Sequence, residues 1–479
     1  MNQPLDSSGS VLRLFSAEYH EYFNMSSHAD TDLQSQLKQL QSRFTWDLRQ
    51  EDMDLDDLSR QLQDAREQQG EQFHAYSHLA YVRYLQGRPE EAESILSQSE
   101  EKIRECYGEK SDLRLIVMYG DLAWLKYHRG DYTQSQNYYK RVQDVLFQHP
   151  TGSPAVLHPE VYGEKAWTFL KFSVSYHHKA IDCFCRALEL QPDASEWNKG
   201  YTIALYRTEP RNAETTPGAE DSPATKQLSR ALDLDPDDGF LLALLALKLA
   251  AHHKHQEAKS LVERALLLSP DDPQVICHVG RYLRQQGQLD RSIDLLQRVL
   301  RRSSRSHFIH HQLALCYRKK KLNLFTRRQS TVAQREIREW RRLCIQHLEE
   351  AVTIKPTFLF ALAELPQQYM EEGDVVRAQK LILQSLDLLS NRDERIRQFV
   401  HLRSGQFYLH HNNQEHEAIT HFTQGLLITT RTMEGRQCAQ NLRKIAEQCL
   451  VRDRSDIKAH GLLGLVNRCE GEERTAGQF

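Results

Sequence analysis

Basic side chains recur along one face of a predicted series of helices. When each helix is aligned by its small residues, the inner side carries Lys165, Lys171, Lys199, Arg207, Arg281, Arg284, Arg318 and Lys319, with His311 among them. Few acids share this register, Glu196 being an exception. A concave row of cations focuses positive potential and attracts phosphate. The alternative is that each is an ordinary solvated Lys or Arg, since about a quarter of any soluble chain is charged.

The chain lacks the sequence motifs of several common enzyme classes. It has no GxxxxGK[ST] phosphate loop, no HExxH, no GxSxG and no GxGxxG after a strand, so we do not expect an enzyme. The histidine-rich runs at 252–255 and 410–416 lack Cys or carboxylate partners at a metal-ligand spacing. We therefore expect no metal site and no cofactor.

A helical repeat of roughly 34 residues positions the basic side chains. It is clearest in the set Ala180, Phe184, Ala187 and Pro192, which is repeated by the set Ala258, Leu261, Ala265 and Pro270. This is the tetratricopeptide pattern: two antiparallel helices approach at small residues, and proline ends the second helix. Each unit covers its apolar face only by stacking on neighbours, so the sequence predicts an all-α superhelix whose function lies in the groove of the stack.

The repeat register divides the chain into four predicted parts. These are a flexible extension over residues 1–27, an N-terminal helical subdomain over 28–158, a central one over 159–300, and a C-terminal one over 301–479 with a truncated last repeat. Helices are expected over 33–44 and from about Asp57 to the residues before Leu79. Interhelix turns are expected at Gly87 and Gly130, and a surface loop at 208–225. A basic insertion after Tyr317 is expected to interrupt its helix until about Arg335.

Composition and cysteine usage indicate the cellular compartment in which the protein is expected. The 479 residues carry 62 Lys and Arg against 65 Asp and Glu, so any binding of nucleic acid must come from a local concentration of charge. The nine cysteines form no CxxC pair and are expected to be buried, reduced thiols. The first residues lack the pattern of a secretory signal, and the longest apolar run, from Phe240 to Leu247, is far too short to cross a membrane. A cytosolic or nuclear protein is expected.

Five segments outside the repeat consensus resemble one known family. They are FTWDLRQEDMDL (44–55), LAYVRYLQG (79–87), EKAWTFLKF (164–172), GYTIALYR (200–207) and HHQLALCYR (310–318). In this order they resemble the interferon-induced proteins with tetratricopeptide repeats, over nearly the whole chain from about Met25. The resemblance implies a cytoplasmic antiviral effector, not an enzyme, with a central basic tunnel that takes the 5′ end of single-stranded RNA.

The resemblance also implies the ligand and the partners. Family members select non-self RNA that carries a 5′-triphosphate, or a cap without ribose methylation, and some block translation initiation on it. Backbone contacts carry no base code, so the sequence of the RNA is expected to matter little. Further partners implied are family paralogues and the translation initiation machinery.

The resemblance implies site residues at the positions of this sequence that match the family's motifs. Lys171 and Arg207 match phosphate-binding residues, Trp167 matches the tryptophan of the 5′-end pocket, and His311 with Gln312 matches the pair that contacts the first nucleotides. Arg284 matches a further basic lining residue, and the repeat register adds Arg281. The register alone favours a packing role for Trp167, as is usual for an aromatic residue at this place in the repeat, and a stacking platform for a base or cap is the alternative.

The chain departs from the family at three places. A family tyrosine is replaced by His177, and an aromatic-arginine-aromatic set is replaced by Gln274, Cys277 and His278, which reduces stacking and charge. The loop after Asp54 is about two residues shorter, and Asp57 and Gln63 are the counterparts of its acidic and glutamine phosphate-site residues. The shorter loop leaves the choice between triphosphate and cap open. Gln274, Cys277 and the truncated last repeat favour the alternative function: a scaffold that binds proteins in the same groove, without selectivity for RNA 5′ ends.

Overall fold

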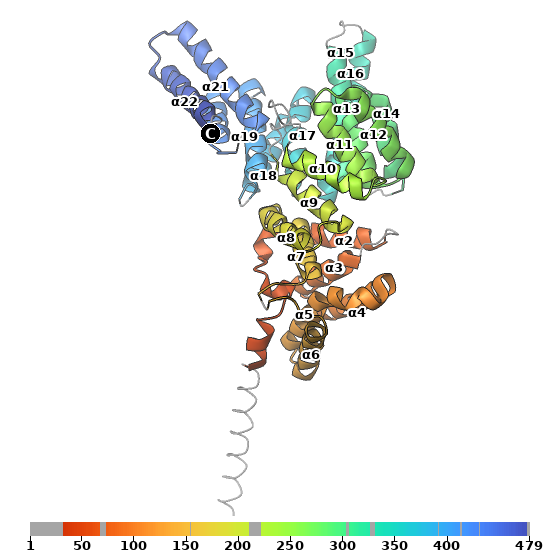
Figure 1. Ribbon diagram of the computed structural model, residues 1–479. Coiled ribbons are helices and arrows are strands. Elements are labelled where there is room, and N and C mark those ends of the chain that lie inside the picture. The colour runs from red at the N-terminus through yellow and green to blue at the C-terminus, as the bar shows by residue number, and fades with distance from the viewer. Residues whose placement is uncertain are drawn as a thin grey trace, which may run out of the picture. The chain divides into compact units, whose positions relative to one another are not determined.

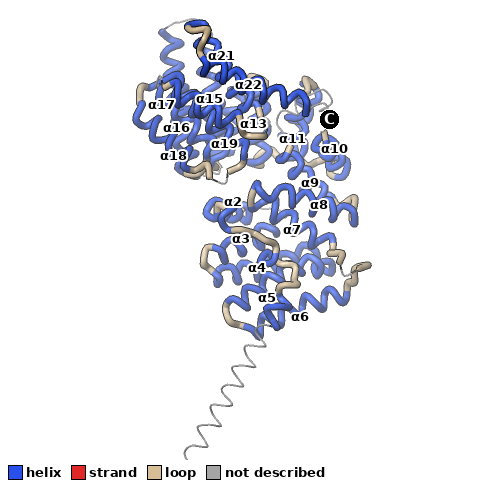
Figure 2. Tube along the Cα trace, turned by 90° about the vertical axis from the view of Figure 1, so that its left-hand side faces the viewer, coloured by secondary structure: helices blue, strands red, loops and turns tan. Residues whose placement is uncertain are grey.

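Helices are the only regular elements in the part of the chain that the structure describes (Figures 1 and 2). This computed structural model describes residues 32–67, 73–153, 155–209, 222–302, 306–325, 331–390, 392–411, 414–430 and 432–476. The chain divides into two compact units, Met1–Ala204 (unit 1) and Leu205–Phe479 (unit 2). The predicted all-α class is confirmed.

Unit 1 is built from helical hairpins that follow one another along the chain. Its elements are η1 (Arg43–Thr45), η2 (Gln50–Asp52), α2 (Leu55–Glu67), α3 (Phe73–Leu85), α4 (Pro89–Tyr107), η3 (Gly108–Lys110), α5 (Ser111–His128), α6 (Tyr132–Gln148), α7 (Pro159–Phe172), η4 (Val174–Tyr176) and α8 (His177–Leu190). Helix α9 (Ser195–Thr208) begins in unit 1 and ends in unit 2. Helices pair as α3 with α4, α5 with α6, and α7 with α8, as the repeat predicts.

Unit 2 continues the same architecture. Its further helices are α10 (Pro223–Leu234), α11 (Gly239–Ala251), α12 (His255–Leu268), α13 (Pro273–Gln285), α14 (Leu289–Leu300), α15 (His307–Phe325), α16 (Thr331–Ile354), α17 (Leu359–Glu372), α18 (Val375–Asp387), α19 (Glu394–His411), α20 (Glu415–Leu426), α21 (Met433–Arg452) and α22 (Ile457–Ala476). Neighbouring helices again pair, from α11 with α12 to α21 with α22.

Small residues set the close approach of the paired helices. Ala180 and Ala187 on α8 are fully buried, and a Cβ added at Gly200 on α9 would lie 2.2 Å from Cζ of Phe184. The turns within the hairpins need a positive φ, which Gly87 (76°) and Gly130 (77°) supply, as the sequence predicts. The corresponding turn between α11 and α12 holds His253 at φ 63°, where a side chain is strained.

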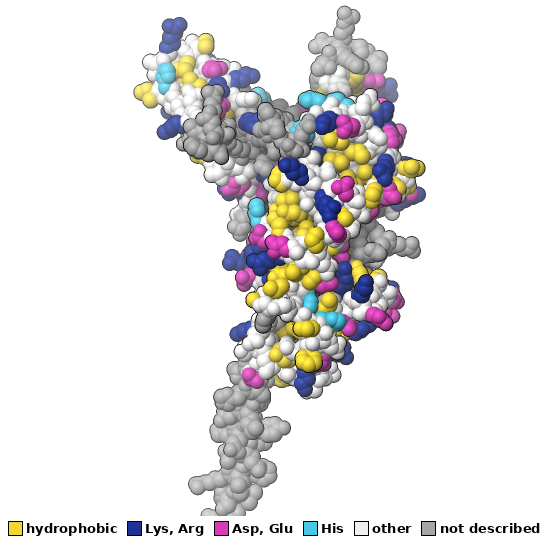
Figure 3. Space-filling model, in the orientation of Figure 1, with side chains coloured by type: hydrophobic (Ala, Val, Ile, Leu, Met, Phe, Trp, Pro, Cys, Tyr) yellow, Lys and Arg dark blue, Asp and Glu magenta, His cyan; other side chains and the backbone are white. Residues whose placement is uncertain are grey.

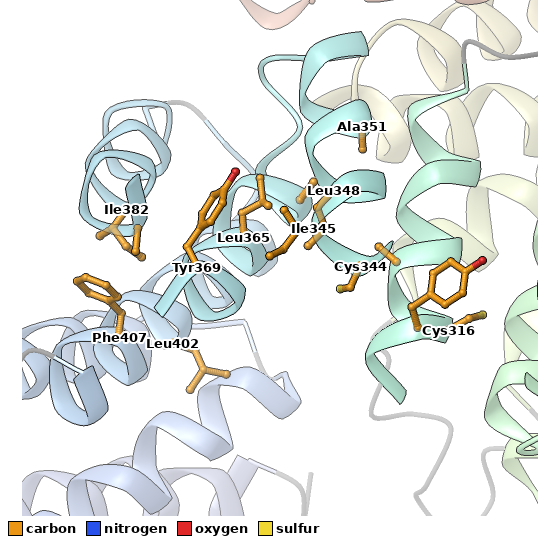
Figure 4. Packing of buried hydrophobic residues seen from close by; sticks show 14 of the residues in the cluster. Cys316, Cys344, Ile345, Leu348, Ala351, Leu365, Tyr369, Ile382, Leu402 and Phe407 are labelled. Carbon is orange, nitrogen blue, oxygen red and sulfur yellow. The ribbon is translucent and has the colours of Figure 1, made fainter. Parts of the chain in front are cut away.

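The largest apolar cluster of unit 2 joins α13 to α22 in one continuous core. Figure 4 shows part of it, from Cys316 and Cys344 through Leu348 and Tyr369 to Phe407. All nine cysteines are free thiols, and Cys277, Cys316, Cys344 and Cys438 are buried. The expected burial is wrong for the other five, of which Cys106 is exposed.

Four expectations about the elements were wrong or fall at least partly outside the described residues. The segment from Asp57 toward Leu79 holds two helices, α2 and α3, rather than one. The basic residues 319–321 do not interrupt α15, which runs on to Phe325, because lysine is compatible with a helix interior and each of the three donates to a neighbouring helix. The extension 1–27 and residues 210–221 of the predicted loop lie outside the described residues.

Candidate nucleic-acid interface

Trp167 and Lys171 lie one helical turn apart on α7 and therefore share a face of it. Lys171 is exposed at the last turn, while Trp167 is half-buried. The indole ring meets Phe184 edge-on, with centroids 5.4 Å apart, and lies 5.9 Å from the ring of His74. Its Nε1 is buried without a hydrogen-bond partner among the described residues. Trp167 thus packs along part of its ring and remains partly accessible.

A chain of buried charges lies beside Trp167 and was missed by the sequence reasoning. The guanidinium of Arg43 binds both Asp121 and Glu164, and Glu164 also binds Nδ1 of His74. His74 Nε2 donates to Glu196 at 2.7 Å, and Arg114 donates to the other oxygen of Glu196 at 2.8 Å. These six residues, Arg43, His74, Arg114, Asp121, Glu164 and Glu196, form what we call the Arg43 network. It joins η1, α3, α5, α7 and α9 within unit 1.

The Arg43 network keeps His74 protonated. Burial opposes the charge, but the attraction of Glu164 and hydrogen bonds to Glu164 and Glu196 outweigh it and raise the pKa of His74 to about 9. Burial likewise opposes the charge of Glu196, yet its bonds with His74 and Arg114 lower its pKa to about 2. The neighbouring His78 behaves oppositely, because burial and the charge of Arg43 hold its pKa well below the usual value. At neutral pH the Arg43 network therefore contains three cations and three carboxylates, whose charges balance.

The His74 charge predicts a pH dependence of stability. Because the folded pKa of about 9 lies above the ordinary 6.5, the imidazolium stabilises the fold fully below about pH 6.5, and this contribution is lost as pH rises through 9. We expect the difference in unfolding free energy between wild type and His74→Gln to be larger at pH 6 than at pH 10 by about 3 kcal/mol. Urea denaturation at both pH values measures it. A difference independent of pH would contradict a protonated His74.

Asp57 and Gln63 are engaged within the α2–α3 hairpin. Asp57 is buried and accepts a hydrogen bond from Gln61 Nε2 at 2.7 Å, and Gln63 Oε1 accepts one from Arg83 Nη2 at 3.0 Å. His177 is buried at the first residue of α8. The preceding Tyr176 donates its hydroxyl to Asp52 at 2.7 Å, which ties η4 to η2.

The remaining predicted site residues lie in unit 2. Arg207 is exposed in the last turn of α9, and Arg395 donates to the carbonyl oxygens of Arg207 and Thr208. Burial, followed by the charges of Arg281 and Arg207, lowers the pKa of His278 to about 3. Histidine at this position is thus neutral and adds no charge.

Arg284, His311 and Gln312 come together on α13 and α15. Arg284 Nη2 donates to Gln312 Oε1 at 3.4 Å. His311 is buried and neutral: burial lowers its pKa to about 4, although Glu364 acts in the opposite direction. Glu364, on α17, is an inward acid that the register did not reveal. The expectation of few acids therefore missed Glu364, which pairs with the predicted cation Arg318 in unit 2.

On the face displayed in Figure 3, Lys and Arg are mixed with Asp and Glu over the surface. Within the described residues, no group of three or more His, Cys, Asp and Glu has the arrangement of a metal site. None of the described helices combines the length and apolar character needed to cross a membrane.

Comparison with known proteins decides the family. Tetratricopeptide repeat models match residues 71–146 and 240–307. Protein IFIT1 homolog B of Homo sapiens is 30% identical over 455 residues, which cover 94% of this chain and 95% of that protein. The chain belongs to the interferon-induced proteins with tetratricopeptide repeats. Human IFIT1, an antiviral innate immune response effector, is 29% identical over 94% of the chain and 95% of its own length.

Solved structures of the IFIT family share this fold. The human IFIT1 dimer with PPP-AAAA matches with a TM-score of 0.79 at 27% identity, covering 93% of this chain and 97% of that one. The human IFIT1 dimer with m7Gppp-AAAA matches with a TM-score of 0.81 at 28% identity, over the same shares of the two chains. These matches confirm the tetratricopeptide architecture and the family resemblance. As an IFIT family member, the chain is not an enzyme.

Proposed function

We propose that this protein binds the 5′ end of non-self single-stranded RNA, bearing either a triphosphate or a cap that lacks 2′-O-methylation, and does not read its sequence. Binding sequesters the RNA or blocks its translation in the cytoplasm, as part of interferon-induced antiviral defence. The observation that carries this proposal is the pairing of a partly accessible indole and an exposed ammonium, Trp167 and Lys171, on one face of α7. The human IFIT1 structures with PPP-AAAA and m7Gppp-AAAA support it.

Each residue type has a role that its chemistry supports. In unit 1, Lys171 binds a phosphate, Trp167 offers its face to a base or cap, and Asp57, Gln63 and His177 border the 5′-end phosphates. In unit 2, Arg207, Arg281 and Arg284 bind phosphates, and His311 and Gln312 contact the first nucleotides. A phosphate-rich 5′ end presents a dense charge to these cations, while contacts with the backbone leave the base sequence unread. Family paralogues and the translation initiation machinery are the further partners that we propose.

The salt dependence of binding separates this function from that of a protein-binding scaffold. Contacts with three phosphates of a single strand give a slope of log affinity against log salt of about −2, so affinity falls about twentyfold between 50 and 200 mM salt. An apolar peptide in the same groove gives a nearly flat line. Fluorescence anisotropy with a short 5′-triphosphate RNA across this salt range measures the slope. A flat line, or no binding at 50 mM salt, would favour the scaffold.

A further inference from the structure

Three cations lie together on the hairpin of α7 and α8 in unit 1. Lys179 and Arg186 are exposed on α8, and Lys165 is half-buried on α7. The charges of Lys179 and Arg186 both act on Lys165, which shows that the three side chains are near one another. We call Lys165, Lys179 and Arg186 the Lys165 triad. Figures 1 and 2 both show α7 and α8 side by side, as their pairing requires.

The Lys165 triad has no carboxylate partner in the part of the chain that the structure describes. Its members contact aromatic rings, and none of them has a hydrogen bond or an ion pair among the described residues. Burial lowers the pKa of Lys165, and the charges of Lys179 and Arg186 lower it further. Like charges held together are unfavourable unless an anion balances them. The triad therefore favours an anionic ligand.

Buried aromatic rings form the floor beneath the Lys165 triad. Lys165 Nζ lies 5.5 Å from the centre of the Trp46 ring, and Lys179 Nζ lies 5.4 Å from that of Tyr176. Both ammonium groups also lie over Phe169, at 6.0 and 5.6 Å. The three rings are only 3–5% exposed, so they offer no face on which a base could stack, as single-stranded nucleic acid requires. They lower the local dielectric, which strengthens the attraction of the triad for a carboxylate.

The Lys165 triad lies on a different face of α7 from Trp167, although the register groups Lys165 with the basic residues of the groove. Two residues separate Lys165 from Trp167, which places their side chains about 200° apart around the helix. On α8, Lys179 and Arg186 are seven residues apart, so they share a face and lie about 10 Å apart along the axis. The triad is therefore a separate and elongated surface of positive charge.

Two exposed acids border the Lys165 triad. The charge of Asp47 acts on Lys165, and that of Asp182 acts on Cys183, a half-buried thiol on which all three cations of the triad also act. A uniformly anionic strand would be repelled at these two acids, whereas a peptide can place neutral or basic residues opposite them. The mixture of charges favours an acidic peptide over a nucleic acid.

We propose that the Lys165 triad binds an acidic peptide segment of a partner protein through the carboxylates of that segment. About four extended residues span the distance of about 10 Å between Lys179 and Arg186, so a short run of acids brings a carboxylate to each member of the triad. The guanidinium of Arg186 can hold a carboxylate through two hydrogen bonds, and each lysine adds a charge-assisted bond. This inference does not depend on the proposed binding of RNA.

Fluorescence anisotropy with a labelled hexaglutamate peptide at low salt tests the site in the full-length protein. Because the chain has a formal net charge of -3, the protein as a whole does not attract this peptide. Lys179→Gln should weaken binding about tenfold, since it removes one charge-assisted contact. Arg186→Gln should do the same, and Arg186→Lys should recover part of the loss. Lys140→Gln, at an exposed lysine of α6 in the same unit, is the matched control and should bind as wild type does.

Cys183 reports where the peptide binds. Saturating hexaglutamate should slow the alkylation of Cys183 by iodoacetamide, because the thiol lies among the cations of the triad. Alkylation of Cys106, which is exposed on α4, should be unchanged. Mass spectrometry of proteolytic fragments measures the two rates separately.

Several outcomes would overturn the inference. Wild type that fails to bind hexaglutamate, variants that bind it as the Lys140→Gln control does, or a Cys183 that stays unprotected would each show that the triad is not a peptide site. A 5′-hydroxyl RNA 10-mer that displaces the peptide, and loses affinity equally in Lys179→Gln, would show a nucleic-acid surface instead. Lys179→Gln should bind 5′-triphosphate RNA as wild type does, so the inference and the proposed function can fail separately.

Discussion

Arg43→Met is expected to lower the free energy of unfolding by about 3–5 kcal/mol, because it removes one partner from a buried ion network. The Arg43 side chain is fully buried, and Asp121 and Glu164 are 2% and 12% exposed. Asp121 also accepts hydrogen bonds from Ser42 Oγ at 2.7 Å and from the backbone N–H of Arg43 at 2.8 Å. Without the guanidinium, two carboxylates face each other with reduced compensation.

Urea denaturation at pH 7 measures this loss. Arg88→Met is the matched control, because its side chain is 54% exposed and pairs with exposed Glu91 on the surface, so it should change stability by less than about 1 kcal/mol. Asp121→Asn in the Arg43→Met background should recover part of the loss by removing an unpaired charge. A loss below about 1 kcal/mol in Arg43→Met would show that the network is dispensable.

Lys171→Glu is expected to abolish the preference for 5′-triphosphate over 5′-hydroxyl RNA. The side chain is exposed at the last turn of α7, one turn from Trp167, so charge reversal places a carboxylate where we propose that a phosphate binds. A lost charge-assisted bond together with a new repulsion reduces affinity for triphosphate RNA by about a hundredfold. Competition between the two RNAs for the purified variant measures the preference.

The control for Lys171→Glu is Lys140→Glu on α6, which makes the same charge change at another exposed position of unit 1. It should lower affinity for both RNAs only slightly, through the long-range field. Because Lys171 is exposed, thermal denaturation of both variants should match wild type. Unchanged triphosphate preference in a folded Lys171→Glu variant would exclude Lys171 as a phosphate ligand.

The hairpins were predictable because their rules are local. Gly87 and Gly130 reveal the turns through the need for positive φ, and the alanines at helical spacing reveal the packed faces. The break between α2 and α3 was missed, although the polar run REQQGEQ at 66–72 separates the apolar residues of the two helices. The basic run in α15 was misread as an interruption, although lysine is compatible with a helix interior.

The charge networks were not predictable because their partners are distant in the chain. Arg43 stands in a short 3-10 turn outside the repeats, 78 residues before Asp121 and 121 before Glu164. A register that aligns helices shows which face a residue shares, not which charges meet there. Arg403 and Glu364 are likewise distant in the chain. In the sequence each resembles a solvated charge, and they meet only when α15, α17 and α19 pack together. The roles that we propose for Trp167, stacking on a base or cap, and for Lys171, binding a phosphate, rest on the accessibility of both side chains on one face of α7.

The most direct test measures binding of the purified protein to one short RNA with four different 5′ ends at physiological salt. The ends are a hydroxyl, a triphosphate, a cap without ribose methylation and a cap with it. Clear preference for the triphosphate or for the unmethylated-ribose cap, lost in Lys171→Glu, is the predicted result. Equal, weak binding of all four RNAs would contradict a 5′-end sensor and leave the protein-binding scaffold as the better description.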